Sequence, residues 1–405
     1  MRDEVIPRGR ADQPQQQETR PMKLMTARER VRAALTHHQP DRVPMDLGGM
    51  NSSTMVVEGY ERLKRHFGVE AEARLADRMQ RIVEIDEPVL RALAIDTRRV
   101  TLGAPDAGLA ADLGPRAYRD MWGVVRENPE GSYYFDLKTC PLAGEVTASD
   151  ILRYPWPNPD DPGFVRGLKE RVQWIRDHTD AAVVLAVPAP FVHISQYLRG
   201  FEDWFCDCAA DMERLEVLFD AVMDVTLHIS RNVLREVGQE VDVLFFADDL
   251  GTQDSLIVSR DLYLKHIKPR HRKFVAALRE LSPATIAFHS CGAVASLIED
   301  FIDIGVQCLN PVQVSAAGMD PVELKRKYRG RMAFWGGTDS QGLVPRGTVD
   351  EVRRMVETLI EDLGEGGGLV FANGHNIQPD VPLENVLAMF EHARAYVPSF
   401  ARASS

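Results

Sequence analysis

The feature that most constrains the fold is an alternation of short apolar runs with longer amphipathic runs, which begins at Thr26 and continues almost to the C-terminus. The short runs are rich in β-branched residues, as buried strands are, and the longer runs have the spacing of helices with one apolar face. Strands and helices that alternate in this way form parallel sheets. Eight strands are predicted, which is the number needed to close an α/β fold of the (β/α)8 TIM-barrel type. They are residues 42–47, 94–102, 181–187, 241–247, 285–289, 306–310, 332–335 and 368–372.

The chain is predicted to form a single domain over residues 26–398, with one insertion into the barrel. Residues 118–145 break the alternation, and they contain the aromatic run Tyr133-Tyr134-Phe135 beside the turn sequence Pro129-Glu130-Gly131. That combination is typical of a β-hairpin, which we expect to follow the second strand. Amphipathic helices are expected to cover the barrel, for example at residues 212–237, 260–281, 348–363 and 382–395.

Charge and composition limit the kinds of partner. The formal net charge is -12, from 60 acidic and 48 basic side chains. A surface with this balance repels nucleic acid and anionic lipid, so neither is expected as a partner. The five cysteines are scattered rather than arranged as a disulfide framework, which favours a reducing cytoplasm. No run of about 18 apolar residues occurs, so no membrane span is expected, and residues 1–25 are predicted to be a disordered tail.

The sequence His289-Ser290-Cys291-Gly292 places two metal-binding side chains at the end of a predicted buried strand. Residues two apart on a strand face the same side, so the imidazole and the thiol would face one small volume, as a zinc site requires. Two ligands do not hold zinc, and a buried cysteine often serves only as a small apolar residue, so a third ligand decides the interpretation. His375 follows the eighth predicted strand and would meet the pair across the barrel mouth. The alternative is that His375 is a hydrogen-bonded structural histidine.

Polar residues follow the predicted strands repeatedly, at the position where barrel enzymes carry their active sites. Asp248 and Asp249 follow the fourth strand, where either would complete a tetrahedral metal site, bind a substrate or simply cap the following loop. Asp339 follows the seventh strand and is a further candidate for a catalytic carboxylate. The candidate substrate-binding residues at other strand ends are Asp46, Asn51, Asn310, Gln313 and Asn373.

Several short motifs, spread over residues 26–396, carry a family resemblance. They are Thr26-Ala27-Arg28-Glu29-Arg30-Val31, Pro40-Asp41-Arg42-Val43-Pro44, Asp248-Asp249-Leu250-Gly251-Thr252-Gln253, His289-Ser290-Cys291-Gly292, Gly336-Gly337-Thr338-Asp339-Ser340-Gln341 and His375-Asn376-Ile377-Gln378. In these motifs the chain resembles the uroporphyrinogen decarboxylase superfamily, and within it the cobalamin-dependent methyltransferase branch. The resemblance implies a (β/α)8 barrel whose active site lies at the C-terminal mouth.

The resemblance to the methyltransferases also implies a zinc site, because His289 and Cys291 occupy the first two positions of their pattern of His-x-Cys plus a later Cys. The later Cys is absent here, and His375 stands near its place. A zinc ion with fewer thiolate ligands is a stronger Lewis acid, which suits an oxygen or nitrogen substrate better than a thiol. True decarboxylases resemble one another in an arginine-rich stretch after the first strand. Residues 45–52 contain no arginine, so a role in haem synthesis is not expected.

We therefore predict a zinc-dependent methyltransferase that moves a methyl group between a small methylated substrate and the cobalt of a corrinoid protein. The substrate would be a methyl ether, giving O-demethylation, or a methylamine. The chain has no cobalamin motif of the Asp-x-His-x-x-Gly kind, so the corrinoid is expected on a separate protein. Asp248 or Asp249, together with Asp339, would orient the substrate or relay a proton. The resemblance also favours a homodimer.

Two alternatives stay open at this point. The first is a metal-free decarboxylase of a small carboxylic acid, in which Asp248 or Asp249 stabilises a protonated intermediate and His289 and Cys291 are merely packed. The second is a non-catalytic barrel that binds a small ligand or a corrinoid protein. Zinc content would separate the first alternative from the methyltransferase, and methyl transfer to cobalt would separate the second.

Overall fold

The computed structural model describes residues 24–402, so almost all of the predicted tail of residues 1–25 lies outside the described part of the chain. The strands are β1 (Leu75–Asp77), β2 (Ile82–Val83), β3 (Thr97–Val100), β4 (Ala111–Asp112), β5 (Ala117–Arg119), β6 (Val125–Glu127), β7 (Asp136–Thr139), β8 (Ala182–Ala186), β9 (Val243–Ala247), β10 (Thr285–His289), β11 (Cys308–Asn310), β12 (Ala333–Trp335) and β13 (Leu369–Val370).

The helices lie mainly between these strands. They are α1 (Ala27–Leu35), α2 (Val57–His66), α3 (Glu87–Ala92), α4 (Ala148–Leu152), α5 (Leu168–His178), α6 (Val192–Arg199), α7 (Phe201–Ala210), α8 (Met212–Val237), α9 (Arg260–Leu262), α10 (Lys268–Leu281), α11 (Ile298–Ile304), α12 (Pro321–Tyr328), α13 (Leu343–Arg346), α14 (Val349–Gly364), α15 (Leu383–Ala395) and α16 (Ser399–Arg402). The predicted helix at residues 260–281 is interrupted by a π-helical turn, η3 (Tyr263–Ile267), just before Pro269, which has no N–H to donate. No helix in the described residues is both long and apolar enough to span a bilayer.

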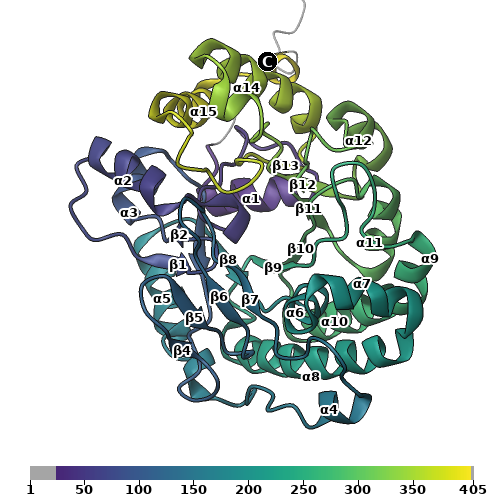
Figure 1. The fold of residues 1–405 in the computed structure, drawn as a ribbon. Coiled ribbons are helices and arrows are strands. Elements are labelled where there is room, and N and C mark those ends of the chain that lie inside the picture. The colour runs from purple at the N-terminus through teal and green to yellow at the C-terminus, as the bar shows by residue number, and fades with distance from the viewer. Residues whose placement is uncertain (1–23, 403–405) are drawn as a thin grey trace, which may run out of the picture.

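Seven parallel strands form a curved sheet in the order β13-β12-β11-β10-β9-β8-β3, which coils into the barrel seen in Figure 1. The gap between β3 and β13 is closed by Met45, which forms a single parallel bridge with Phe371. On one side Asp46 N donates to Phe371 O at 2.8 Å, and on the other Asp96 N donates to Met45 O at 2.8 Å. The predicted (β/α)8 barrel is confirmed, with its first strand, expected at residues 42–47, reduced to this bridge.

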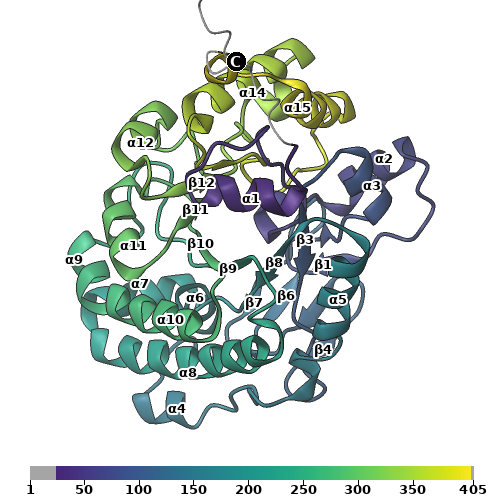
Figure 2. The ribbon, with the colours of Figure 1, turned by 180° about the vertical axis from the view of Figure 1, so that it is seen from behind.

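Apolar side chains, most of them small, fill the barrel interior, and α1 closes its N-terminal end. The inner cluster contains alternate residues of the strands, such as Ala287 on β10 and Cys308 on β11. Val31 and Leu35 of α1 pack against it, and α1 lies across that end of the barrel in Figure 2. Because side chains alternate along a strand, the residues two positions further along β10 and β11 also face inward, at the C-terminal mouth.

A buried ionic cluster joins α1 to the closing segment of the barrel. Asp96 is 1% exposed, and it accepts hydrogen bonds from Arg30 Nη1 at 2.6 Å and Arg42 Nη1 at 2.7 Å. The same carboxylate accepts a hydrogen bond from Met45 N at 2.7 Å. Arg30 also pairs with Asp41, with 2.6 Å between Nε and Oδ1. The cluster therefore fixes the Met45 segment against both α1 and β3.

The insertion after β3 is larger than the predicted hairpin at residues 118–145. It is a four-stranded antiparallel sheet in the order β4-β5-β6-β7. The predicted turn at residues 129–131 does connect two antiparallel strands, β6 and β7. β4 and β5 have only two and three residues, which is too short for an alternating pattern to be recognised. The hydroxyl of Tyr134, in the β6–β7 connection, donates to Asn376 Oδ1 at 3.3 Å, so the insertion reaches the barrel mouth.

Candidate metal centre

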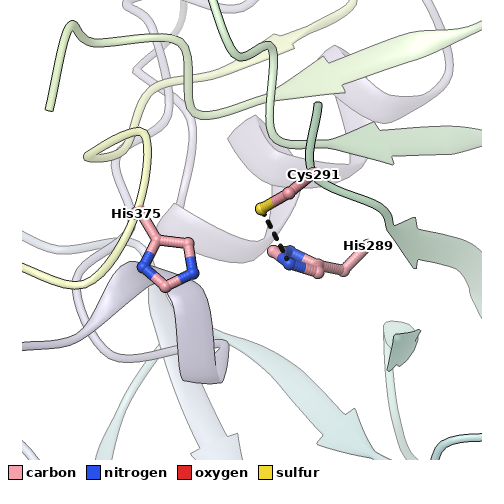
Figure 3. A group of neighbouring side chains, drawn as sticks. All are labelled: His289, Cys291 and His375. Atoms are coloured by element: carbon pink, nitrogen blue, oxygen red, sulfur yellow. Dashed lines mark hydrogen bonds between the residues drawn. The ribbon is translucent and has the colours of Figure 1, made fainter. Parts of the chain in front are cut away.

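Three side chains meet at the C-terminal mouth of the barrel, namely His289, Cys291 and His375 (Figure 3). One ligand atom of each lies within 4.8 Å of the others, and Cys291 Sγ is 3.4 Å from His289 Nε2. Zinc binds nitrogen at about 2.0 Å and sulfur at about 2.3 Å, so the ligand atoms of a tetrahedral site lie about 3.3–3.5 Å apart. Cys291 Sγ and His289 Nε2 already have this separation, and His375 would complete the set by moving toward them.

The two loops that follow β9 and β10 hold this group together. His289 is the last residue of β10, and Cys291 N in the next loop donates to Asp249 Oδ1 at 2.8 Å. Gly292 has a φ of 88°, and a Cβ atom there would lie 2.5 Å from the backbone of the loop after β9. Only glycine permits so close an approach in that conformation. His375 comes from the loop after β13, on the other side of the mouth.

Asn310 fixes the orientation and the tautomer of His289. The strand register pairs the two residues, and Asn310 Oδ1 lies 2.6 Å from His289 Nδ1. Asn310 Nδ2 donates to Trp335 O at 3.1 Å, and Ser52 Oγ donates to Asn310 Oδ1 at 2.7 Å, so Oδ1 is the amide atom that faces the imidazole. His289 Nδ1 must then be the donor, which leaves the lone pair of Nε2 directed at Cys291. A metal-binding imidazole needs this arrangement.

Replacing Asn310 with leucine is expected to weaken zinc binding about 10- to 100-fold, because His289 loses the acceptor that fixes its tautomer. Isothermal titration of metal-free protein with zinc would measure the effect. Asn310→Asp keeps an acceptor oxygen at the same place and is the matched control, with affinity close to that of the wild type. Equal zinc affinity in Asn310→Leu and the wild type would rule out this supporting role.

Burial keeps all three candidate ligands uncharged in the metal-free protein. It lowers the pKa of His289, and burial together with His289 lowers the pKa of His375 to about 4. Burial and the neighbouring Asp249 raise the pKa of the Cys291 thiol well above its ordinary value. At neutral pH the two imidazoles are therefore ready to bind a metal, whereas the thiol must release a proton when the metal binds.

Asp249 connects the group to His193, a residue that the sequence analysis missed. Its carboxylate lies 3.5 Å from His289 Nε2 and 3.3 Å from His193 Nε2. Burial would raise the pKa of Asp249, but His193 beside it and the hydrogen bond from Cys291 N hold it well below its usual range. Burial lowers the pKa of His193, but the two carboxylates beside it outweigh this and raise it above its ordinary value. Asp249 N also donates to His193 Nε2 at 3.1 Å, so the backbone and the carboxylate of Asp249 together hold this imidazole beside the candidate ligands.

Asp248 points away from this group and supports the fold instead. It is fully buried, and it accepts hydrogen bonds from the backbone N–H groups of Val192 at 3.2 Å and His193 at 2.9 Å. His271 Nε2 lies 3.1 Å from the same carboxylate. Asp248 thus anchors the N-terminus of α6, which carries His193, and of the two adjacent aspartates only Asp249 faces the candidate ligands.

Asp46 and Asn373 are also buried within the protein rather than presented to a ligand. Asp46 accepts hydrogen bonds from Gly49 N at 2.8 Å and Trp335 Nε1 at 2.9 Å, so it ties the first strand to β12. Asn373 Nδ2 donates to Ser52 O at 3.2 Å. Both residues therefore hold the loops of the mouth in place, where the sequence predicted contact with the substrate.

Two cavities adjoin the candidate ligands. The first, of about 250 Å³, is lined by His289, His375, Asp249, His193 and Asn51, together with apolar residues such as Phe245 and Ile194. The second, of about 260 Å³, is lined by Cys291, His375, Gln313 and Asp339. Gln313 and Asp339 thus reach a cavity, but the Asp339 carboxylate is engaged by the N–H groups of Gly342 at 2.8 Å and Leu343 at 3.1 Å.

Aromatic residues that the sequence did not single out complete the first cavity. The ring of Tyr197 is parallel to that of His193, with 6.0 Å between the ring centres, and it lines the same space. Arg126 from the inserted sheet lies 4.4 Å above the Tyr197 ring. His193 follows the third predicted strand, so the rule that found the other residues would have found it too. No sequence signal placed Arg126 here, because the way in which the insertion packs against the barrel was not predicted.

A family model described as uroporphyrinogen decarboxylase (URO-D) matches residues 134–396, which is more than half of the chain. The chain belongs to the uroporphyrinogen decarboxylase family. Among the curated relatives, a methylcobamide:CoM methyltransferase of Methanosarcina barkeri (strain Fusaro) is 26% identical to this chain over 255 residues, covering 61% of this chain and 66% of the relative. A uroporphyrinogen decarboxylase of Methylococcus capsulatus is 33% identical over 270 residues, covering 63% of this chain and 71% of the relative.

The fold of this chain is also found in a solved structure. A methyltransferase from Methanosarcina mazei superposes with a TM-score of 0.61 at 19% identity, over 91% of this chain and 98% of that chain. A further methylcobamide:CoM methyltransferase of Methanosarcina barkeri is 27% identical over 175 residues, or 42% of this chain and 47% of the relative. The matched segments thus span about half to two thirds of the curated methyltransferases.

Proposed function

We propose that this protein is a zinc-dependent methyltransferase that moves a methyl group between a small methylated substrate and the cobalt of a corrinoid protein. The observation that carries the proposal is the convergence of His289, Cys291 and His375 at the wall of a cavity in the barrel mouth. Similarity to methylcobamide:CoM methyltransferases supports the same reaction class. The corrinoid would arrive on a separate protein, because the chain has no cobalamin motif. A cytoplasmic location and a homodimer stay predictions.

The donor set suits zinc, since two neutral imidazoles and one thiolate supply three of the four ligands of a tetrahedral site. His289 would bind through Nε2, because its Nδ1 is held by Asn310. Bound at these residues, zinc would act as a Lewis acid that polarises the heteroatom bearing the methyl group. With one thiolate among three ligands, the centre favours an oxygen or nitrogen substrate, such as a methyl ether or a methylamine, over a thiol.

The remaining cavity residues would position the substrate and handle its proton. Apolar side chains, among them Phe245 and Ile194, line the space beside His289 and His375 and would hold the methyl group there. His193 is held against Asp249 Oδ2 at 3.3 Å and lines the same cavity. We assign to this pair the proton that the heteroatom takes up when the methyl group leaves. Asp248 acts by holding α6, and with it His193, in position.

The proposal is tested by methyl transfer to reduced cobalamin in the presence of zinc-loaded protein and a panel of methyl ethers and methylamines. The appearance of methylcobalamin, followed by absorbance, is the expected result, and His289→Ala should abolish it. The family also contains decarboxylases, so release of carbon dioxide from small acids is measured in parallel. Decarboxylation that is unchanged in His289→Ala, without any methylation of cobalt, would replace the methyltransferase with the metal-free decarboxylase.

A further inference from the structure

One wall of the first cavity offers hydrogen-bond donors from two carboxamides whose oxygen atoms are already engaged. Asn51 Oδ1 accepts a hydrogen bond from Arg99 Nη2. Gln80 Oε1 accepts one from Asn376 Nδ2 at 3.2 Å. Asn51 and Gln80 both line the cavity, on the wall that also includes Met79. Their amide nitrogens are therefore the groups left to meet a ligand, so this wall favours a ligand group that accepts hydrogen bonds.

Arg99 lies behind this wall; the residue is partly exposed, and its guanidinium has no carboxylate partner within ion-pair distance in the described residues. Its Nε and Nη1 atoms are buried and have no hydrogen-bond partner there. The neighbouring Arg98, which alternates to the other face of β3, pairs with Glu87 at 2.7 and 3.0 Å. Burial lowers the pKa of Arg99 to about 10, so the group is still charged at neutral pH. The acidic residues that act on it do so at longer range; they are Asp77, Glu84 and Asp46.

A buried charge without a partner is unfavourable, and the planar guanidinium is best satisfied by a carboxylate. The two amide donors of Asn51 and Gln80 and the Arg99 cation behind them all favour a ligand with an anionic oxygen. The candidate metal ligands His289 and His375 line the same cavity, so one small molecule can contact both the amide donors and the candidate metal ligands.

We propose that the cavity binds a methylated substrate that also carries a carboxylate. The carboxylate is held by Asn51 and Gln80 in the field of Arg99, and the methyl-bearing heteroatom faces His289 and His375. The placement of the methyl-bearing heteroatom rests on the proposed function. The placement of the carboxylate rests only on the amide donors of Asn51 and Gln80 and on Arg99. The cavity thus selects methoxy or methylamino acids over their neutral counterparts.

Matched acid and amide pairs test the assignment by direct binding, without a corrinoid protein. Isothermal titration would compare 3-methoxybenzoate with 3-methoxybenzamide, and methoxyacetate with methoxyacetamide, on zinc-loaded protein. At least one acid is expected to bind about tenfold more tightly than its amide, since charge-assisted hydrogen bonds are stronger than neutral ones. The preference should disappear in Arg99→Gln and persist in Arg98→Gln, the matched control on the same strand.

Asn51→Asp provides a second test that leaves Arg99 in place. The new carboxylate would occupy the guanidinium and repel an acid, so the preference for acids should be lost there too. Equal binding of acid and amide, no binding of either acid, or a preference that survives in both Arg99→Gln and Asn51→Asp would overturn the proposal. A preserved acid preference without methylation of cobalt would overturn the proposed reaction and leave the carboxylate site established.

Discussion

Protein with Cys291 replaced by alanine is expected to bind zinc more than about a hundredfold more weakly than the wild type, because loss of a direct ligand exceeds the effect of losing a supporting residue. His289→Ala and His375→Ala should behave in the same way. Metal analysis of the purified proteins would give about one zinc ion per wild-type chain, the stoichiometry of a single mononuclear site, and far less in the three variants. Methyl transfer should fall with the metal content.

The pH dependence of zinc uptake provides a further check on Cys291. Its thiol carries a proton in the metal-free protein, since burial and Asp249 raise its pKa, and the thiolate is the form that binds metal. Zinc binding therefore releases a proton, and the affinity should rise as the pH rises through the neutral range. Cys140→Ala removes a partly buried thiol elsewhere and is the matched control, with zinc binding unchanged. Zinc bound equally by Cys140→Ala and Cys291→Ala would remove Cys291 from the site.

Asp96→Ala is expected to lower the free energy of unfolding by about 3–5 kcal/mol, the cost of removing one partner from a buried ionic cluster. Arg30 and Arg42 would keep their charges in a buried setting, and Met45 N would lose its acceptor at the seam of the barrel. Chemical denaturation followed by circular dichroism would measure the change. Glu323→Ala breaks an exposed pair with Arg326 and should change stability by less than about 1 kcal/mol. Similar values for the two variants would contradict the structural role given to Asp96.

The order of the barrel strands and the three candidate metal ligands could be predicted because they depend on local patterns. Residues 285–289 were predicted as a strand with the bounds that β10 has, since an apolar run that ends in polar residues marks its own limits. The position of His375 beyond the last strand then followed from the geometry of a closed barrel. The support that Asn310 gives to His289 depends on the register between β10 and β11, which no single segment encodes.

Asp248 and Asp249 show where sequence reasoning stopped. Both residues follow β9, and their side chains point to opposite faces of the extended backbone. Phe245 belongs to the inner cluster of the barrel, so strand alternation already favours Asp249 as the residue that faces the mouth. The role of Asp248 could not be foreseen, because its partners are backbone groups of α6, far away in the chain. The inserted sheet was underestimated for a different reason, since its strands are too short to carry a pattern.

The seam at Met45 has a consequence for how the chain is made. Phe371 pairs with Met45, and Gly368 N donates to Ala34 O at 2.7 Å, so the last strand completes contacts with the first helix and strand. Most of the sequence must therefore be synthesised before the barrel can close. Until then the Met45 segment presents an unpaired edge, which is a site for mispairing with other chains. We expect folding to finish only after synthesis, with the newly made chain dependent on protection from aggregation during that interval.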